Sequence, residues 1–265
     1  MVEQAVVAAN FGAQLQRHRT ARHMSQLDLA GKCGISARHL SFLESGRALP
    51  SRDMVLRLCG GLLLPLSAQN ALLLTAGFAP VFPASPLQSE ALGPFRIVLD
   101  EMIARHEPNP ALLVDRHWNV REANAAARLL LSHLQEDGEE TNLARLLVAN
   151  TRAQAVIANF SEVLHEITAR LQLEALEAGG DPNLSQLVAE LERACAAHPL
   201  AGARTRRPVL PLVLNVAGAT WRFLSVIAHF GTSEDVTIRD LRLELLFPAD
   251  ADTRAAVKAL AARKG

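Results

Sequence analysis

The chain has 265 residues, 49% of them hydrophobic, and its 27 Lys and Arg residues balance its 27 Asp and Glu residues. This length predicts two domains, and the composition excludes an intrinsically disordered chain. Cys33, Cys59 and Cys195 lie far apart and form no C-x-x-C pair, so neither a disulfide framework nor a zinc site is predicted.

Membrane segments, a signal peptide and catalytic motifs are not predicted from the sequence. No apolar run approaches the ~18 residues that a membrane span needs, and residues 1–9 lack the basic start of a signal peptide. We therefore expect a cytoplasmic protein with reduced thiols and no membrane partner. P-loop, G-x-G-x-x-G, G-x-S-x-G and H-E-x-x-H motifs are all missing, so no catalytic residue, metal or required cofactor is predicted.

The balanced total charge hides an asymmetry along the chain. Residues 1–80 hold eight Lys or Arg and four Asp or Glu, hence +4, whereas residues 81–265 hold 19 and 23, hence −4. A basic N-terminal part fits phosphate binding, and an acidic remainder argues against DNA contact there.

The first elements in chain order are a lead-in over residues 1–9 and a helix over 10–22. The segment 24–50 then predicts a helix-turn-helix. Ser25 is an N-cap with Asp28 three residues later, Gly34 suits the tight turn, and Ser36 caps a second helix. Leu40 and Leu43 of that helix face inward, which leaves its other face for DNA.

In such a motif the second helix enters the major groove and its early residues contact base edges. Arg38 can pair with guanine, Phe42 can contact a thymine methyl, and Ala37 allows close approach. Gln26, at the start of the preceding helix, and Arg47, in the following loop, are phosphate candidates. The full set of predicted DNA-binding residues is Gln26, Ser36, Ala37, Arg38, Ser41, Phe42, Ser45 and Arg47.

Residues 10–76 resemble the Xre/Cro/phage-repressor family. The matching residues are Phe11-Gly12, Leu15, Arg19, Met24-Ser25-Gln26, Leu29-Ala30, Gly34-Ile35-Ser36, Leu40-Ser41, Glu44, Gly46-Arg47 and Pro50-Ser51. The resemblance implies a buried ion pair between Arg19 and Glu44, bases read from positions 37, 38 and 42, and phosphates held by Gln26, Ser45 and Arg47. Ala37 and Phe42 depart from the hydrogen-bonding residues common in phage repressors, which leaves the DNA sequence read open. A helix-turn-helix kept only for protein contacts is the alternative.

Further along, Ser51 caps a helix over 52–60 and residues 66–76 form a fifth helix. A proline-rich linker follows over 77–87. The remainder, 88–265, predicts an α+β domain. Its expected elements are a helix over 92–106, strands over 111–114 and 118–122, helices over 123–131, 141–177 and 183–197, a three-strand meander over 209–216, 220–230 and 236–247, and a helix over 250–263.

This order of elements resembles a PAS domain, and Asn124-Ala125 matches the start of the helix after the second PAS strand. With the N-terminal domain, the chain resembles the MmyB-like transcription regulators. The supporting pieces are Asp115-Arg116-His117-Trp118-Asn119 and Leu243-Glu244-Leu245. The resemblance implies a PAS-like ligand-binding domain, and fatty-acid-like molecules are the ligands associated with it.

Both faces of the strand 220–230 are apolar, which indicates that each face is covered, one of them by a ligand or a second subunit. Plain core packing, or an ordinary hydrogen-bonded role for the polar side chains, is the alternative. The predicted ligand contacts are Arg116, Trp118, Phe160, Leu164, Val213, Phe223, Val226 and His229.

The sequence thus predicts a one-component regulator with a five-helix N-terminal domain and a PAS-like C-terminal domain. Its expected partners are a double-stranded DNA operator, a second copy of the chain and a small apolar ligand such as a fatty acid. Two alternatives stay open: a C-terminal domain that binds protein without a ligand, and an enzyme fused to a DNA-binding domain.

Overall fold

The computed structural model describes residues 2–135, 142–178, 181–200, 209–216, 218–231 and 233–262. The chain divides into two compact units. The first contains residues 1–84 with 172–185 and 234–236, and the second contains the other residues. Among the described helices, none is long and apolar enough to cross a membrane.

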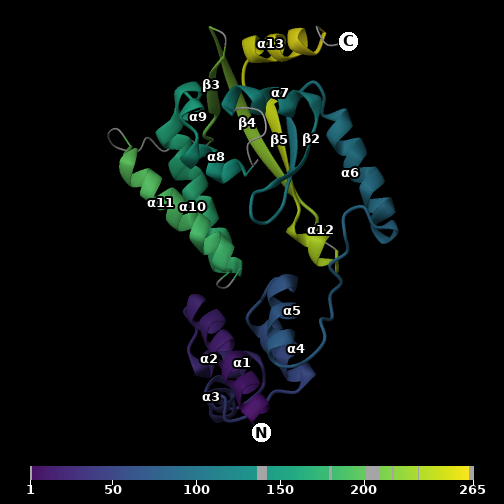
Figure 1. The fold of residues 1–265 in the computed structure, drawn as a ribbon, viewed down its shortest axis with the longest axis vertical. Helices are drawn as coiled ribbons and strands as arrows, with labels where there is room; N and C mark the ends of the chain where they lie inside the picture. Colours follow the sequence, from purple (N-terminus) through teal and green to yellow (C-terminus); the bar gives the residue numbers. More distant parts are fainter. Residues whose placement is uncertain are drawn as a thin grey trace. The chain divides into compact units, whose positions relative to one another are not determined.

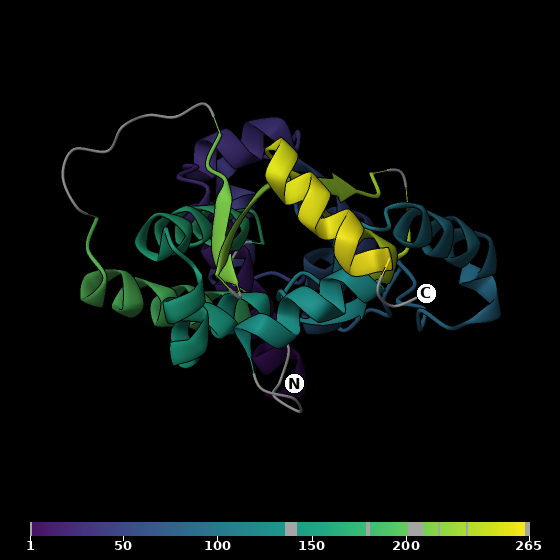
Figure 2. The same ribbon diagram turned by 90° about the horizontal axis from the view of Figure 1, so that it is seen from above.

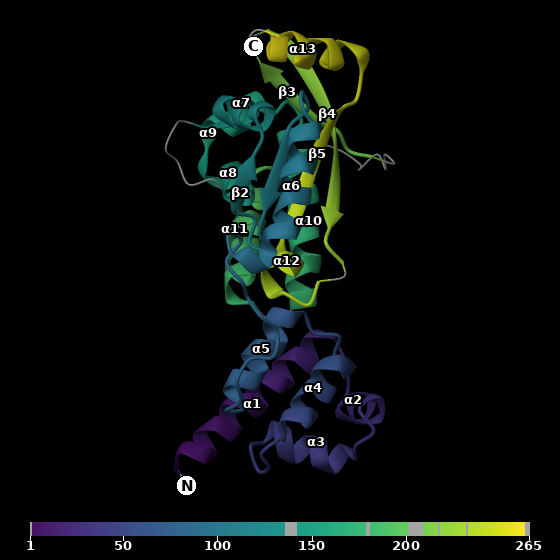
Figure 3. The same cartoon turned by 90° about the vertical axis from the view of Figure 1, so that its right-hand side faces the viewer.

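The N-terminal unit holds five described helices (Figures 1 and 3). They are α1 (Val2–Ala21), α2 (Gln26–Lys32), α3 (Ala37–Glu44), α4 (Arg52–Gly61) and α5 (Leu66–Thr75). Their apolar faces meet in one core that includes the fully buried Phe11, Leu15, Leu40, Leu43 and Leu58. Serine N-caps start α2, α3 and α4, because each Ser hydroxyl accepts the backbone N–H three residues on and satisfies a donor that the helix leaves open.

Helix α1 is longer than the sequence pattern predicts, since it begins at Val2 rather than at residue 10. Residues 2–9 contain several alanines and neither glycine nor proline, so nothing in their backbone chemistry stops the helix. The expected lead-in over 1–9 is therefore helical from its second residue.

The predicted linker is extended and is held by hydrogen bonds, one of them from the Val236 N–H to the Pro83 carbonyl at 2.8 Å. The Asn70 side chain on α5 accepts the backbone N–H groups of Val81 and Phe82, at 3.1 Å each, and donates to the Phe82 carbonyl at 2.7 Å. These three hydrogen bonds connect the middle of the proline-rich stretch to α5, the last helix of the N-terminal unit. The backbone of residues 81–82 is therefore fixed to α5.

The C-terminal unit is built on one antiparallel sheet of five described strands. The strands are β1 (Ala111–Val114), β2 (Val120–Ala123), β3 (Leu212–Val216), β4 (Ala219–His229) and β5 (Arg242–Pro248). Their order across the sheet is β2-β1-β5-β4-β3, so the late strand β5 joins the early hairpin to the late one. Register pairs such as Leu113↔Leu243 and Val226↔Leu245 fix which side chains share a face.

Helices cover both faces of this sheet (Figures 1 and 2). On one face, Leu99 and Ile103 of α6 (Gly93–Arg105, after a short 3-10 turn at Glu90–Leu92) pack with Leu113 and Leu243. The other face meets the helices between β2 and β3, and α13 packs against β4 and β5. These helices are α7 (Ala125–Leu134), α8 (Leu143–Ala149), α9 (Thr151–Val156), α10 (Phe160–Ala178), α11 (Pro182–Ala197) and the C-terminal α13 (Ala251–Ala262).

The helix predicted over 141–177 is wrong as a single element, because it breaks into α8, α9 and α10. Two asparagines cause the breaks. Asn150 leaves the helical region (φ −115°, ψ 109°), and its side chain accepts the Arg152 N–H at 2.8 Å. Asn159 donates to the Pro211 carbonyl and accepts the Val213 N–H, which ties this corner to the sheet. Asparagine offers the backbone such alternatives to a helix. Residue 141 lies outside the described residues.

The last predicted strand is also shorter than expected, because residues Val236–Asp240 form helix α12 and β5 begins only at Arg242. The β-branched residues Val236, Thr237 and Ile238 favour a strand locally. The sheet overrides this preference, since the neighbouring strand β1 ends at Val114, which pairs with Arg242. Likewise β3 starts at Leu212 and β2 at Val120, so Trp118 lies in a turn.

These observations confirm the predicted fold class. A helical N-terminal domain precedes an α+β domain of PAS-like type with a curled antiparallel sheet.

Candidate DNA-binding surface and ligand cavity

The turn between α2 and α3 sets the angle of the helix-turn-helix. At its start, Ser25 and Asp28 form a reciprocal capping box: the Ser25 hydroxyl accepts the Asp28 N–H at 3.1 Å, and the Asp28 carboxylate accepts the Ser25 N–H at 2.9 Å. Gly34 takes a left-handed conformation (φ +61°), and the Ile35 N–H then donates to the Ala30 carbonyl. This is the backbone geometry that the sequence pattern predicts for Gly34.

Helix α3 presents the predicted DNA-reading residues on its open side. The Ser36 hydroxyl caps it by accepting the His39 N–H at 3.1 Å, and Leu40 and Leu43 are fully buried. Arg38 is exposed, whereas Ala37, Ser41 and Phe42 are half-buried. The guanidinium carbon of Arg38 lies 5.4 Å from the centre of the Phe42 ring, which is a cation–π distance.

A buried polar network fixes the far end of α3. Two nitrogens of Arg19, on α1, donate to the Glu44 carboxylate at 2.6 Å and 2.8 Å, and the side chains of this ion pair are 9% and 3% exposed. A third nitrogen donates to the Met24 carbonyl at 2.7 Å. The hydrogen bonds that Arg19 donates to Glu44 raise the pKa of the Arg19 guanidinium further. The ion pair therefore holds α1, and the residues just before α2, against the end of α3.

The structure gives the predicted phosphate contacts different surroundings. The Gln26 amide donates to the Glu44 carboxylate at 2.8 Å, so its side chain already belongs to the buried network. Ser45 and Arg47 are exposed in the loop after α3, where the Ser45 hydroxyl and the Arg47 N–H both donate to the Phe42 carbonyl. The predicted surface is thus contiguous from α3 into its following loop.

Gly12 matches the family pattern, and the structure shows a packing role for it that the sequence did not reveal. A Cβ at this position on α1 would lie 2.4 Å from the Glu44 carbonyl oxygen and 2.6 Å from that of Leu43. Only glycine allows α1 to approach the end of α3 this closely. The packing of α1 on α3 therefore depends on Gly12 as well as on the ion pair.

In the C-terminal unit, an aspartate organises the turn between β1 and β2. The Asp115 carboxylate accepts the N–H groups of His117 and Asn119 at 2.8 Å and 3.0 Å, and also two nitrogens of Arg121. Burial alone would raise the pKa of Asp115, but the hydrogen bonds from Asn119 and Arg121 hold it below its ordinary value. Trp118 sits in this turn at φ +67°, a conformation that bulky residues rarely adopt.

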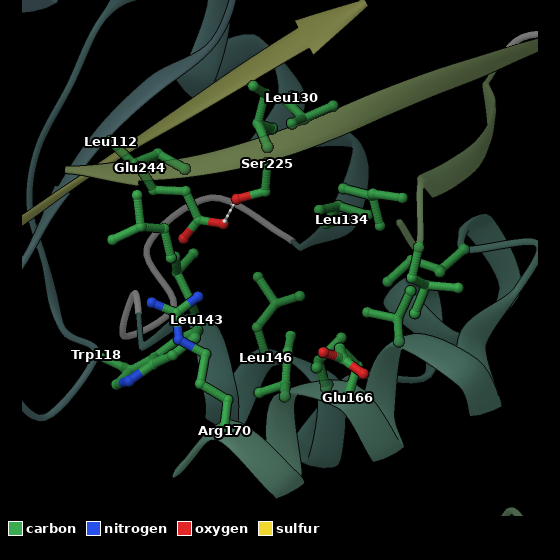
Figure 4. A pocket seen from close by; sticks show the side chains of 18 of the residues that line it. Leu112, Trp118, Leu130, Leu134, Leu143, Leu146, Glu166, Arg170, Ser225 and Glu244 are labelled. Atoms are coloured by element: carbon green, nitrogen blue, oxygen red, sulfur yellow. Dashed lines mark hydrogen bonds between the residues drawn. The ribbon is translucent and has the colours of Figure 1, made fainter. Parts of the chain in front are cut away.

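Trp118 forms part of a cavity of about 530 Å³ between the sheet and the helices α7, α8 and α10 (Figure 4). Most of the wall is aliphatic, from Leu130 and Leu134 on α7, Leu143 and Leu146 on α8, and Leu246 on β5. Ligand pockets generally have volumes of roughly 300–1,000 Å³ and mostly apolar walls. The cavity therefore has the size and character of a site for a small apolar molecule.

A few polar groups line the cavity from two sides, Glu166 and Arg170 from α10 and Ser225 and Glu244 from the sheet (Figure 4). Arg170 of α10 lies with its guanidinium carbon 4.9 Å from the centre of the Trp118 ring (Figure 4). Ser225 of β4 donates to the Glu244 carboxylate of β5 at 2.8 Å, and Glu166 lies one turn from Arg170. Glu166 and Ser225 remain exposed although they line the cavity, so its polar side is open to solvent.

Of the eight predicted ligand contacts, only Trp118 is among the described residues that line this cavity. Phe160 and Leu164 are buried elsewhere on α10, where the Phe160 ring meets the His198 ring edge to face. Arg116 pairs with Asp240 at 3.5 Å. The other four are the buried Phe223, the half-buried Val213, and the exposed Val226 and His229.

The sequence reasoning missed Arg170, Glu166, Ser225, Glu244 and the leucines of α7 and α8. On α10 the cavity residues Val163, Glu166, Ile167 and Arg170 follow the i, i+3, i+4, i+7 spacing of one helix face. The charged Glu166 and Arg170 on this otherwise apolar helix face were the sequence signal that could have indicated a ligand site. Among the described residues, no cluster of His, Cys, Asp or Glu could hold a metal ion.

Two family models match the chain. The MmyB-like transcription regulator ligand binding domain matches residues 95–260, and a helix-turn-helix domain matches residues 10–72. A search of curated proteins finds no relative of significant similarity. The first match covers more than half of the chain, and both matches agree with the two units described above. The chain therefore belongs to the family of MmyB-like transcription regulators, with a DNA-binding helix-turn-helix domain and a ligand-binding domain.

Proposed function

We propose that this regulator binds a double-stranded operator through residues 10–76 and a small apolar ligand, of the fatty-acid class, through residues 88–265. Residues 77–87 connect the two domains. The single observation that carries the ligand assignment is the leucine-lined cavity of about 530 Å³. Ligand occupancy changes the spacing of the two DNA-binding domains in a dimer, and thereby the affinity for the operator.

The polar side of the cavity suits the head of an amphiphile. A ligand carboxylate can accept hydrogen bonds from Arg170, whose guanidinium carries five N–H donors and can serve more than one partner. The aliphatic chain then packs against Trp118 and the leucines of α7 and α8. Glu166 and Glu244, which also line the cavity, disfavour a second negative charge on the ligand. A monocarboxylate with one apolar chain fits this pattern.

A homodimer is the form in which we expect the protein to bind DNA, because one helix-turn-helix module reads only a half-site. Exposed apolar side chains support association. Ile97 and Val98 of α6 are 69% and 52% exposed, and Val226 and Phe247 on the sheet are 50% and 40% exposed. Sedimentation of the purified chain tests this expectation, and a monomer at operator-binding concentrations would contradict it.

The ligand assignment is tested by extracting the purified protein with organic solvent and identifying the released molecules by mass spectrometry. Neighbouring residues of β4 supply a matched pair of variants, since Ile227 lines the cavity and Val226 points to the opposite face. Wild type and Val226→Trp should release a stoichiometric lipid. Ile227→Trp, whose indole fills the cavity, should release little.

The second candidate function is protein binding: in this alternative, the C-terminal domain binds another protein and holds no small ligand. The exposed Val226 and Phe247 on the sheet favour it. A clean extract from wild type, together with unchanged thermal stability when fatty acids are added, would shift the assignment to this alternative.

A further inference from the structure

The outward face of α3 carries an arginine and an aromatic ring that contact each other. Arg38 and Phe42 are four residues apart, hence on the same side of the helix, and the guanidinium carbon lies 5.4 Å from the ring centre. Phe42 is half-buried, and its carbonyl accepts the N–H groups of Arg47 and Ala48. These bonds fix the backbone of Phe42 at the end of α3, and its half-buried ring gives the exposed Arg38 a surface on which to lie.

This contact limits the conformations of Arg38 before DNA arrives. A long exposed arginine loses rotamer freedom when it docks on a base, and an arginine already lying on a ring loses less. The fork of the guanidinium matches the O6 and N7 acceptors of guanine in the major groove. The phenyl ring offers no hydrogen bond, and the thymine methyl is the apolar group that the major groove presents to it.

The spacing of the two groups sets which base pairs they reach. Residues four apart rise about 6 Å along a helix, and the Arg38 guanidinium carbon lies 5.4 Å from the centre of the Phe42 ring. Successive base pairs rise about 3.4 Å. The two groups are therefore close enough together to contact the edges of neighbouring base pairs.

We propose that Arg38 and Phe42 act as one reading unit, with Arg38 paired to a guanine and Phe42 against the methyl group of a thymine on the adjacent base pair. This assignment rests on the proposed DNA-binding function and specifies what that surface recognises. Ala37 carries no hydrogen-bonding group in its side chain and Ser41 can bond to any base, so neither sets this preference.

The test begins by selecting binding sites for the full-length protein from a random duplex library. In the best site, thymine beside the guanine is replaced by uracil, which removes only the methyl group, and guanine is replaced by 7-deazaguanine, which removes only the N7 acceptor. Loss of one buried methyl group should weaken wild-type binding about fourfold. Loss of one half of the guanine contact should weaken it by about two- to tenfold.

The variants assign each effect to a side chain. In Phe42→Ala the uracil duplex should bind as well as the thymine duplex, and in Arg38→Ala the 7-deazaguanine duplex should bind as well as the guanine duplex. Arg47→Ala is the matched control, because a phosphate contact weakens all sequences alike and leaves both base effects intact. Phe42→Leu, which keeps an apolar side chain and should retain part of the methyl effect, serves if Phe42→Ala is poorly folded.

Two different failures can be told apart. A selected site that lacks thymine beside guanine, or a uracil effect that persists in Phe42→Ala, would overturn the reading unit and leave DNA binding intact. A protein that enriches no sequence above bulk DNA would overturn the proposed DNA-binding function itself.

Discussion

Glu44 joins three parts of the helix-turn-helix through one carboxylate. It ends α3, accepts two hydrogen bonds from Arg19 on α1, and accepts another from Gln26 at the start of α2. Because its side chain is only 3% exposed, water cannot replace these partners if the carboxylate is removed. At the scale of the residue, this network decides whether the recognition helix is held in place.

Glu44→Ala should destabilise the N-terminal unit by about 3–5 kcal/mol, because it leaves the Arg19 charge buried without its partner. Hydrogen exchange of the α1 and α3 amides measures the free energy of opening of this unit directly. The double variant Arg19→Met/Glu44→Leu, which removes both charges, should lose less than the single variant. A loss below ~1 kcal/mol in Glu44→Ala would show that the network contributes little.

His18 makes the stability of the same unit depend on pH. It is 8% exposed, and burial, then the charges of Arg22 and Arg17, lower its pKa to about 4 from 6.5. Between these values the unfolded chain binds a proton that the folded chain does not. Stability is therefore complete above about pH 6.5 and is lost as the pH falls towards 4.

His18→Leu should remove this dependence. The stability of wild type relative to the variant should fall by at most about 3 kcal/mol between pH 7.5 and 4.5, measured by hydrogen exchange in α1. Comparison with the variant cancels carboxylates such as Asp115 and Asp250, which titrate in both proteins. A stability difference that stays constant over this range would mean that His18 has the same pKa in the folded and the unfolded chain.

At the scale of the element, the β1–β2 turn positions the Trp118 ring at the wall of the cavity. The Asp115 carboxylate satisfies backbone N–H groups on both sides of Trp118, and this holds the residue at φ +67°. A non-glycine residue in this region costs about 1–3 kcal/mol, so the surrounding bonds must impose it. The turn therefore links the register of the hairpin to the shape of the cavity.

Asp115→Ala should destabilise the C-terminal unit by about 1–3 kcal/mol through unsatisfied buried donors and should expose Trp118. Acrylamide quenching of fluorescence in a Trp221→Phe background, where Trp118 is the only tryptophan, reports this exposure. Asp115→Asn keeps one acceptor oxygen and should have a smaller effect. Quenching of Asp115→Ala identical to the parent would show that other contacts hold the turn.

Local chemistry explains which elements the sequence predicts well. The caps Ser25, Ser36 and Ser51 and the turn at Gly34 act within a few residues, so α2, α3 and α4 and the DNA-reading face follow from the pattern. The sheet joins Ala111 to Leu245, and this long-range pairing shortens β5 and leaves α12 as a helix. Periodicity within one segment cannot reveal a partner so distant along the chain.

The cavity was less predictable for the same reason. Its wall combines α7, α8 and α10 with the sheet, and the order in which these helices pack depends on the breaks at Asn150 and Asn159. Trp118 was found because its turn is a local motif. Arg170 was missed because its place beside Trp118 exists only once α10 has docked.

At the scale of the whole molecule, the two family domains separate their charges as well as their roles. Residues 1–80 carry a net +4 and the remaining chain −4, from the counts of Lys, Arg, Asp and Glu. Binding to DNA should therefore come from the N-terminal part and should weaken with salt. The acidic remainder disfavours further contact with the duplex, which suits a domain that modulates binding rather than adding to it.

The measurement that tests the account most directly is operator affinity with and without ligand. Delipidated protein and protein loaded with a saturated fatty acid are titrated, by fluorescence anisotropy at fixed salt, against duplexes whose two half-sites are separated by different spacings. Coupling between sites in regulatory proteins is typically about 1–3 kcal/mol, or roughly 5–150-fold. We predict a change of this size that depends on half-site spacing and disappears in Ile227→Trp. Equal affinities for the loaded and delipidated protein at every spacing would contradict ligand-controlled DNA binding.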